Sequence, residues 1–308
     1  MKIIVLGSGA GGGFPQWNCA CALCSGMRQG RLRSRPRTQS SIAISADGRD
    51  WVLLNASPDL GPQLRQTPAL HPPGPALRHS PICAVVLMDA QIDHVTGLLG
   101  LREGPPLALY CTPSVFDDLT TGLPLLRVLE HYCGVHWHVV PVAGESAEAS
   151  FVIPQCPALR FHAVAISGKA PPYSPARHDP VPGTNIALVV DDTATGQRLF
   201  YAPGLADVGE TERRWMSSAS CVLVDGTFWR EDEMPAAGLG HKLAAEMGHL
   251  PLSGGRGMIA ALRGLPAQRK VLIHVNNSNP ILDEDSAQRQ ELARHGIEVA
   301  HDGMEMEL

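Results

Sequence analysis

The sequence lacks a hydrophobic run long enough to cross a lipid bilayer. Its apolar stretches, such as residues 82–88, are far shorter than the roughly 20 residues that a membrane-spanning helix needs. At the N-terminus, one lysine precedes a short apolar stretch and then glycines, which is unlike the long apolar segment and cleavage site of a secretory signal. We therefore expect a cytoplasmic protein without a membrane span.

The sequence also lacks a surplus of positive charge. Its formal net charge at pH 7 is −5, and no basic stripe with interleaved aromatic residues occurs. Because binding to nucleic acid depends on clustered Lys and Arg, we expect no nucleic-acid partner. No charged tail, solenoid repeat or linker divides the chain, so residues 1–308 are expected to form one domain.

The cysteines do not have the spacing of a disulfide framework. Cys19, Cys21 and Cys24 lie close together, and the others of the eight are scattered singly. Three thiols this close can surround one ion, and thiolates suit tetrahedral zinc. The alternatives are three ordinary buried cysteines, or a redox pair of Cys21 and Cys24, which would normally open a helix beside a strand. The spacing favours a structural zinc in a Cys-rich loop at residues 14–30, with a fourth ligand from Cys, His or an oxygen donor elsewhere.

Short runs rich in Val, Ile and Leu predict strands, and fewer stretches have a helical pattern. The predicted strands are 2–6, 41–45, 51–55, 82–88, 107–111, 160–166, 185–191, 198–202, 220–225 and 271–275. The predicted helices are 57–67, 94–101, 113–120, 122–132, 252–264 and 284–295, the last opening at Asp283 and closing near Gly296. The pattern predicts an α/β fold in which two sheets pack together and helices cover their outer faces.

A glycine-rich turn follows the first predicted strand. Gly7, Gly9 and Gly12 have the G-x-G-x-x-G spacing of a dinucleotide-binding turn. That fingerprint needs a helix to begin there, whereas Phe14-Pro15-Gln16-Trp17 and the cysteines follow. We favour a turn that lets the chain pass close to a site. The Pro-rich stretches 68–81 and 170–183 predict long surface loops, the second a candidate lid.

Acidic and histidine side chains occur where several predicted strands end. The run 82–88 is followed by Asp89-Ala90-Gln91-Ile92-Asp93-His94, and Asp225 and His274 end later strands. Such positions are well placed to line a site. His249 precedes the predicted helix 252–264. The simpler interpretations are histidines satisfied by their neighbours and an Asp93 that only caps a helix.

These elements resemble the metallo-β-lactamase superfamily. The segment from Asp89 to His94 is similar to its motif His-x-His-x-Asp-His, with Asp89 and Gln91 in place of both leading histidines. Gly248-His249 is similar to the Gly-His-Ser/Thr element of the phosphodiesterase and tRNA-processing branch, and His274 matches the last metal ligand. The middle histidine is absent near residues 166–168. The resemblance implies an αββα sandwich of two mixed β-sheets flanked by helices.

Across nearly the whole chain, the motifs resemble the pyrroloquinoline quinone (PQQ) biosynthesis protein B family. The motifs that carry this resemblance include the cysteine cluster, Pro182-Gly183-Thr184-Asn185, Asp225-Gly226-Thr227-Phe228-Trp229 and His274-Val275-Asn276-Asn277. The resemblance implies a structural Zn²⁺ on Cys19, Cys21 and Cys24, and the position of the fourth ligand in the related phosphodiesterases falls on Asn277.

The same resemblance implies a non-haem iron-dependent hydroxylase that acts on a tyrosine-derived diamino acid cut from a precursor peptide. Asp93, His94 and His274 would form a two-His-one-carboxylate site for Fe²⁺, with Zn²⁺ or Mn²⁺ as alternatives. His249 and Asp225 are the candidates for catalytic acid–base help.

Two other functions remain as alternatives. A PQQ-binding carrier that assists release or transport would bind the quinone without turnover. A metal-dependent hydrolase or phosphodiesterase would need a dinuclear zinc site, which the absence of histidine at positions 89 and 91 counts against. In each case the expected partner is a small molecule, either the precursor or PQQ, and a homodimer is left open.

Overall fold

The computed structural model describes residues 1–75 and 77–308, and its strands form two seven-stranded sheets. In spatial order, the first sheet contains β14 (Glu305–Glu307), β1 (Lys2–Gly7), β2 (Ser41–Ser45), β3 (Trp51–Leu54), β4 (Ile82–Val86), β5 (Leu107–Cys111) and β6 (Val135–Val139). The second contains β13 (Ile297–Val299), β12 (Arg269–Ile273), β11 (Cys221–Asp225), β10 (Arg198–Ala202), β9 (Ile186–Asp192), β8 (Leu159–Ala165) and β7 (Glu148–Val152). Both sheets are mixed, because β3–β6 and β10–β13 are parallel runs and the other neighbours are antiparallel.

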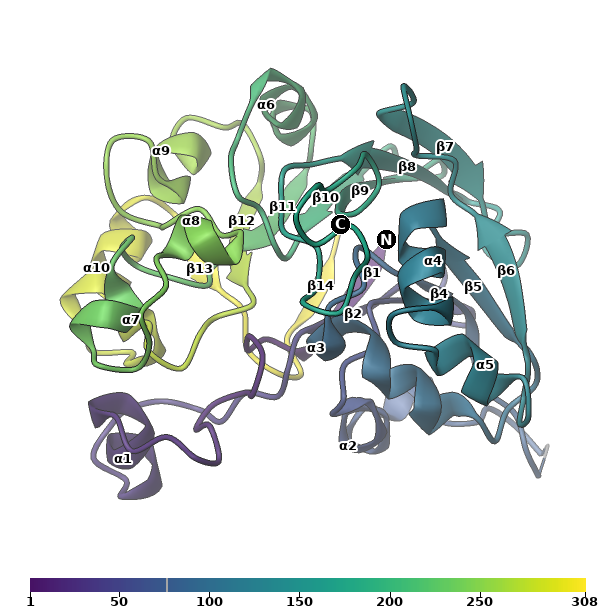
Figure 1. Cartoon of the computed structure of the whole chain (residues 1–308), viewed down its shortest axis with the longest axis horizontal. Coiled ribbons are helices and arrows are strands. Elements are labelled where there is room, and N and C mark those ends of the chain that lie inside the picture. The colour runs from purple at the N-terminus through teal and green to yellow at the C-terminus, as the bar shows by residue number, and fades with distance from the viewer. Residues whose placement is uncertain (76) are drawn as a thin grey trace.

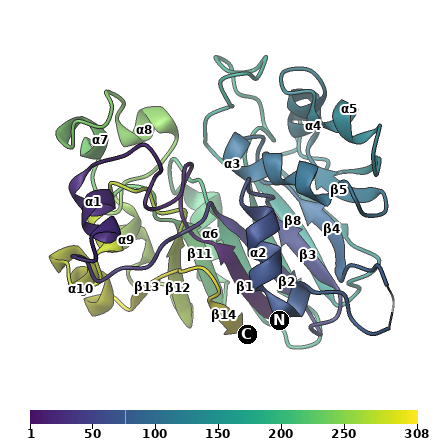
Figure 2. The same cartoon turned by 90° about the horizontal axis from the view of Figure 1, so that it is seen from below.

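Helices cover the outer faces of the two sheets (Figures 1 and 2). The α-helices are α1 (Ala22–Arg28), α2 (Leu60–Gln66), α3 (Ile92–Val95), α4 (Pro113–Thr120), α5 (Leu125–Leu129), α6 (Glu210–Ser217), α7 (Glu233–Ala236), α8 (Ala244–Met247), α9 (Met258–Leu262) and α10 (Ala287–Arg294). The 3-10 helices are η1 (Pro68–Leu70), η2 (Thr96–Leu101) and η3 (Pro280–Leu282). Among the residues described, no helix is long and apolar enough to cross a membrane.

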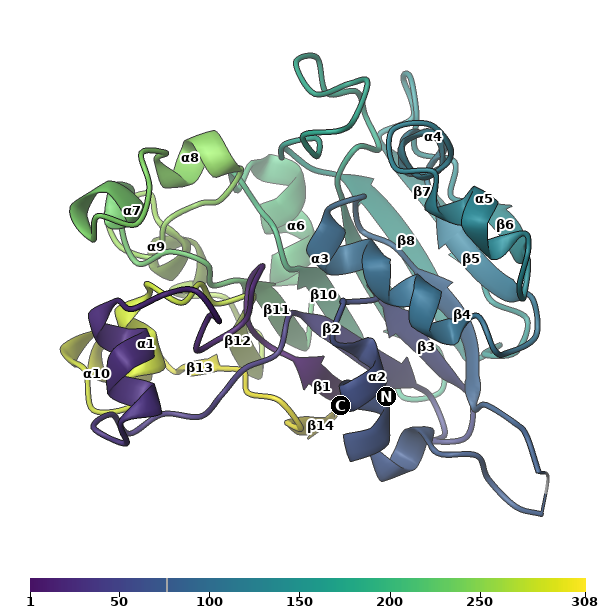
Figure 3. The same ribbon diagram turned by 60° about the horizontal axis from the view of Figure 1, so that its bottom comes forward.

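The hydrophobic core consists of three layers of buried side chains. One lies between the sheets and includes Ile3, Phe161 and Ile273. The helices α2 to α5 enclose the second on the first sheet, and α6, α9 and α10 enclose the third on the other sheet (Figure 3). Successive side chains of a strand point to opposite faces of its sheet, and the inner strands are apolar on both faces. Each sheet therefore packs against the other sheet on one face and against helices on the other. The predicted α/β class with an αββα sandwich is confirmed.

Some predicted helix limits are wrong. The helix predicted at 252–264 begins only at Met258. The last helix does not open at Asp283, because Ser286 caps it by accepting a hydrogen bond from the Arg289 backbone N–H. It ends as predicted near Gly296, which has a positive φ of 64°. In the Pro-rich stretch 68–81, residue 76 lies outside the described residues.

Gly97 allows η2 to pass directly over the chain that follows β3. A Cβ at Gly97 would lie 2.0 Å from the Ser57 carbonyl oxygen and 2.8 Å from that of Ala56. We therefore expect Gly97→Ala to lower the free energy of unfolding by roughly 1–3 kcal/mol in urea titrations, because the backbone must shift. Gly100→Ala in the same helix is the control, since a Cβ there meets nothing within 4 Å. Equal stability of both variants would contradict the close approach.

Candidate metal centre

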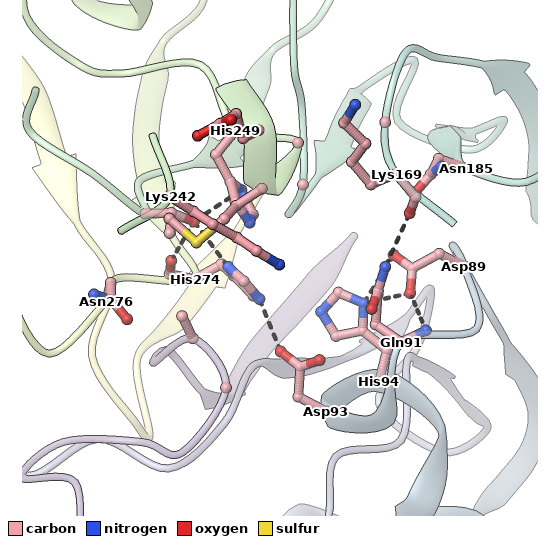
Figure 4. A pocket seen from close by; sticks show the side chains of 18 of the residues that line it. Asp89, Gln91, Asp93, His94, Lys169, Asn185, Lys242, His249, His274 and Asn276 are labelled. Atoms are coloured by element: carbon pink, nitrogen blue, oxygen red, sulfur yellow. Dashed lines mark hydrogen bonds and ion pairs between the residues drawn. The ribbon is translucent and has the colours of Figure 1, made fainter. Parts of the chain in front are cut away.

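A pocket of about 250 Å³ opens where β4, β11 and β12 end (Figure 4). Asp93 and His94 lie in α3 just beyond β4, and His274 directly follows β12. His249 lines the same pocket, and Asp225, the last residue of β11, is fully buried behind it. The structure thus brings together all five side chains predicted for the active site. Their roles as metal ligands and as an acid–base pair stay predictions.

His94 is oriented by Asp89. Its Nδ1 lies 2.8 and 2.9 Å from the two carboxylate oxygens of Asp89, so Nδ1 carries a proton, and its Nε2 lies 3.4 Å from the Ser40 hydroxyl. Both side chains are nearly buried. Burial alone lowers the pKa of His94, but the carboxylates of Asp89 and Asp93 more than offset this and raise the pKa to about 9. The acidic surroundings therefore favour a cation at this histidine.

Thr227 and Asp225 orient the other two histidines. Asp225 Oδ2 lies 2.7 Å from His249 Nδ1, and Asp225 Oδ1 accepts a hydrogen bond from the Thr227 hydroxyl at 2.6 Å. Burial raises the pKa of Asp225, but the charge of His249 lowers it below its ordinary value, so the carboxylate is an acceptor. Thr227 Oγ1 can then accept from His274 Nδ1, which lies 2.9 Å away. All three histidines thus have a possible acceptor beside Nδ1, as metal-ligating histidines usually do.

His274 and Asp93 meet face to face. Nε2 of His274 lies 3.1 Å from Asp93 Oδ2. In the tautomer with the proton on Nδ1, Nε2 is an acceptor that faces the carboxylate, and a divalent cation bound to both atoms would stabilise this arrangement. His274 also has a φ of 61°, a conformation rare for a non-glycine residue, and its carbonyl lies 2.9 Å from Thr227 Oγ1. The donor set of Asp93, His94 and His274, with ligand atoms within 4.8 Å of one another, fits a divalent metal.

The alternative in which Asp93 only caps a helix is wrong. Asp93 lies inside α3, whose N-cap residue is Gln91. Burial raises the pKa of Asp93, but the charge of His94 and the hydrogen bond to His274 hold it well below its usual range. The carboxylate is therefore ionised, and its Oδ2 faces His274.

Asp89 and Gln91 have supporting roles in the positions where the superfamily motif has histidines. Asp89 binds His94, as described above. The Gln91 side-chain amide donates to the Lys169 carbonyl at 2.9 Å and so ties the 166–172 segment to the pocket. Asp89 and Gln91 therefore lack the imidazole nitrogens that the motif histidines would offer. A second group of potential ligands, Asp225, His249 and His274, also has ligand atoms within 4.8 Å of one another and shares His274 with the first group.

Asp89→Asn is expected to weaken metal binding at the Asp93, His94 and His274 group. Loss of the charge that polarises the His94 ring should reduce the affinity about 10-fold, the lower end of the range for such supporting carboxylates. Competition with a chromogenic chelator measures this. Asp179→Asn, on an exposed residue of the 170–183 stretch, is the matched control. Identical affinities in both variants would mean that Asp89 does not support the metal.

The glycine-rich turn lies against this site, and no helix follows it directly. A Cβ on Gly11 would lie 3.4 Å from Asp93 Oδ2, and Ala10 and Gly11 line the pocket. The next helix, α1, begins only at Ala22. The interpretation of the turn as a close approach to a site is confirmed, and a dinucleotide fingerprint is wrong.

Several pocket residues were not predicted from the sequence. They include Thr227, which joins His249, His274 and Asp225, and the polar side chains at the pocket mouth, Lys169, Asn185 and Lys242. Thr227 lies in the quoted Asp225-Gly226-Thr227 motif, which was its available signal. The 170–183 stretch contributes Pro172 and Arg177 to the pocket, and its movement as a lid stays a prediction.

The cysteine cluster lies apart from this pocket, beside the segment that follows His274. The three thiols of Cys19, Cys21 and Cys24 lie within 4.8 Å of one another. Asn277 Nδ2 is 3.2 Å from Cys19 Sγ and 3.5 Å from Cys24 Sγ. The amide oxygen and nitrogen of Asn277 exchange places by a half-turn, so its oxygen can equally face the thiols. Three thiolates and one oxygen fit tetrahedral zinc.

Comparison with known proteins agrees with this geometry. Residues 50–275 match the family described as the Beta-lactamase superfamily domain. Proteins named coenzyme PQQ synthesis protein B are 57% identical in Azotobacter vinelandii and 56% identical in Methylococcus capsulatus, with 100% of each chain covered. The crystal structure of Zn²⁺-bound PqqB from Methylobacterium extorquens is 39% identical, with a TM-score of 0.87 and 100% of both chains covered. The chain therefore belongs to the beta-lactamase superfamily and, within it, to the coenzyme PQQ synthesis protein B family.

Proposed function

We propose that this protein acts in the biosynthesis of PQQ as an Fe²⁺-dependent hydroxylase of a tyrosine-derived diamino acid. The observation that carries the proposal is the convergence of His94, His274 and Asp93, with both histidines oriented by their Nδ1 atoms. Two histidines and one carboxylate on one face leave other metal positions free for substrate and O₂. Family membership supplies the pathway, because the relatives are named for PQQ synthesis.

The residues divide the chemical work. Asp93, His94 and His274 would hold the metal, and Fe²⁺ bound there would supply the redox chemistry that O₂ activation needs. His249 binds Asp225 through Nδ1, so its Nε2 can accept or return a proton on the pocket side. Asp225, fully buried, stabilises the charged form of His249. Cys19, Cys21, Cys24 and Asn277 are proposed to hold a separate structural zinc.

A dinuclear hydrolase is the weaker alternative. Such an enzyme needs a full set of ligands for a second metal. Asp225, His249 and His274 could supply part of that set, but Asp89 is engaged with His94 and Gln91 binds the Lys169 carbonyl. A carrier that only binds PQQ would use the same pocket, and oxygen insertion separates it from an enzyme.

Oxygen insertion provides the test. The protein is loaded with Fe²⁺ without O₂, mixed with the diamino acid and a reductant such as ascorbate, and exposed to ¹⁸O₂. One oxygen atom enters the product and the other leaves as water, which uses two electrons and two protons. We expect a product mass gain from ¹⁸O that His94→Ala abolishes. Bound iron with intact substrate would reject the hydroxylase, and tight binding of PQQ without turnover would then favour the carrier.

A further inference from the structure

Two lysine side chains lie at the mouth of the metal pocket on opposite walls. Lys242 comes from the segment between α7 and α8, and Lys169 from the segment between β8 and β9. In Figure 4, Lys242 lies on the side of His249 and His274 with its ammonium group toward the pocket, whereas Lys169 lies beside Asn185 with its ammonium group pointing away from the histidines. Both are exposed, and neither forms an ion pair within the described residues.

The acidic groups of the pocket are already engaged. Asp89 binds His94, and Asp93 faces His274. Glu246, at the mouth, accepts the Leu243 backbone N–H at 2.7 Å and caps α8. The neutral N–H leaves the charge of Glu246 in place, so the mouth carries Lys169, Arg177 and Lys242 against one carboxylate, and its net charge is positive although that of the protein is negative. A positive opening on a negative protein attracts anionic ligands selectively.

Contacts at Gly248 and Gln91 position the segment that carries Lys169 against the end of α8. Gly248 has a φ of 88°, and a Cβ there would lie 3.1 Å from Lys169 Cγ. The Lys169 stem thus packs on the α8 end, while the Gln91 amide holds the Lys169 carbonyl from below. Arg177, which lines the same pocket, donates to the Ala170 carbonyl and stiffens this loop. The backbone and stem of Lys169 are consequently held in place, while its exposed ammonium group is free to turn toward a ligand at the pocket mouth.

We propose that Lys242 and Lys169 bind two separate carboxylate groups of one substrate and so select a polycarboxylate. The inference rests on the proposed function for the identity of that substrate, a diamino acid with two α-carboxylates. A ligand held at both ends would span the pocket mouth between the two lysines. A molecule with one carboxylate, such as tyrosine, would engage only one lysine.

Equilibrium binding without O₂ tests the proposal. Calorimetry on the metal-loaded protein compares the diamino acid, PQQ and tyrosine. Each lysine would form a charge-assisted hydrogen bond that becomes covered when the ligand binds. We therefore expect Lys242→Gln or Lys169→Gln to bind the diamino acid and PQQ about 10-fold more weakly, and the double variant about 100-fold more weakly. Lys242→Arg should restore most of the affinity. Lys270→Gln, in β12 away from the pocket, is the control.

The outcomes separate this inference from the proposed reaction. Binding that depends on both lysines, with normal metal content and no oxygen insertion, would support the carboxylate site and reject the hydroxylase. Oxygen insertion by Lys242→Gln and Lys169→Gln with an unchanged KM would support the hydroxylase and reject the carboxylate site. Wild-type protein that binds neither the diamino acid nor PQQ, or that binds tyrosine as tightly as the diamino acid, would also overturn the carboxylate site.

Discussion

His274→Ala is expected to remove the active-site metal and abolish turnover. His274 has three roles at once: its Nε2 faces Asp93, its Nδ1 is held by Thr227, and its ring lies against that of His249. Loss of a supporting partner of a metal ligand typically reduces activity 10- to 100-fold. Loss of the ligand itself should therefore lower kcat by more than about 100-fold. Metal analysis should show one metal fewer per chain.

The control for this variant is a histidine outside the site. His131→Ala replaces an exposed side chain at the end of α5 and should leave metal content and kcat unchanged. Since His274 has a positive φ, its replacement also alters local strain, so urea titration should accompany the metal analysis. If folded His274→Ala protein retains the full metal content, the two-histidine centre is wrong.

The strands that sequence patterns predicted are those inside the sheets. The ten predicted strands correspond to β1–β5 and β8–β12, while β6, β7, β13 and β14 were missed. All four missed strands are sheet edges. An interior strand is covered on both sides and reads as an apolar run, whereas an edge strand has half-exposed, polar positions, as Glu148–Val152 shows. Edge strands in such a sandwich are recognised only from their pairing.

The site was predictable to the extent that it lies in local motifs. Asp93, His94 and His274 stand at the ends of apolar strands, which is a signal in the sequence itself. Thr227 has only its place in the motif that follows β11, and Lys242 carries no such signal. Thr227 acquires its role because β11 lies between β10 and β12, which places its hydroxyl beside His274. Lys242 acquires its proposed role only because a loop returns over the pocket.

Cys24→Ser is expected to remove the other metal and to destabilise the fold. Cys24 is fully buried in the cluster that covers the second sheet, and its thiol lies 3.5 Å from Asn277 Nδ2. A zinc site there would join the N-terminal loop to the segment after β12. Structural zinc contributes directly to folding free energy, so we expect a loss on the order of 4 kcal/mol in chemical denaturation.

Cys133→Ser supplies the matched control, because Cys133 is a half-buried single cysteine far along the chain from the cluster. It should leave the zinc content unchanged and should change the stability by no more than about 0.5 kcal/mol.

The comparison with His274→Ala tests whether the two metal centres are independent. If the two centres are separate, Cys24→Ser loses only zinc and keeps the pocket metal, while His274→Ala loses only the pocket metal. A Cys24→Ser protein that keeps its zinc would show that the cysteines are ordinary core thiols. Loss of both metals in either variant would mean that the loop from His274 to Asn277 couples the two centres.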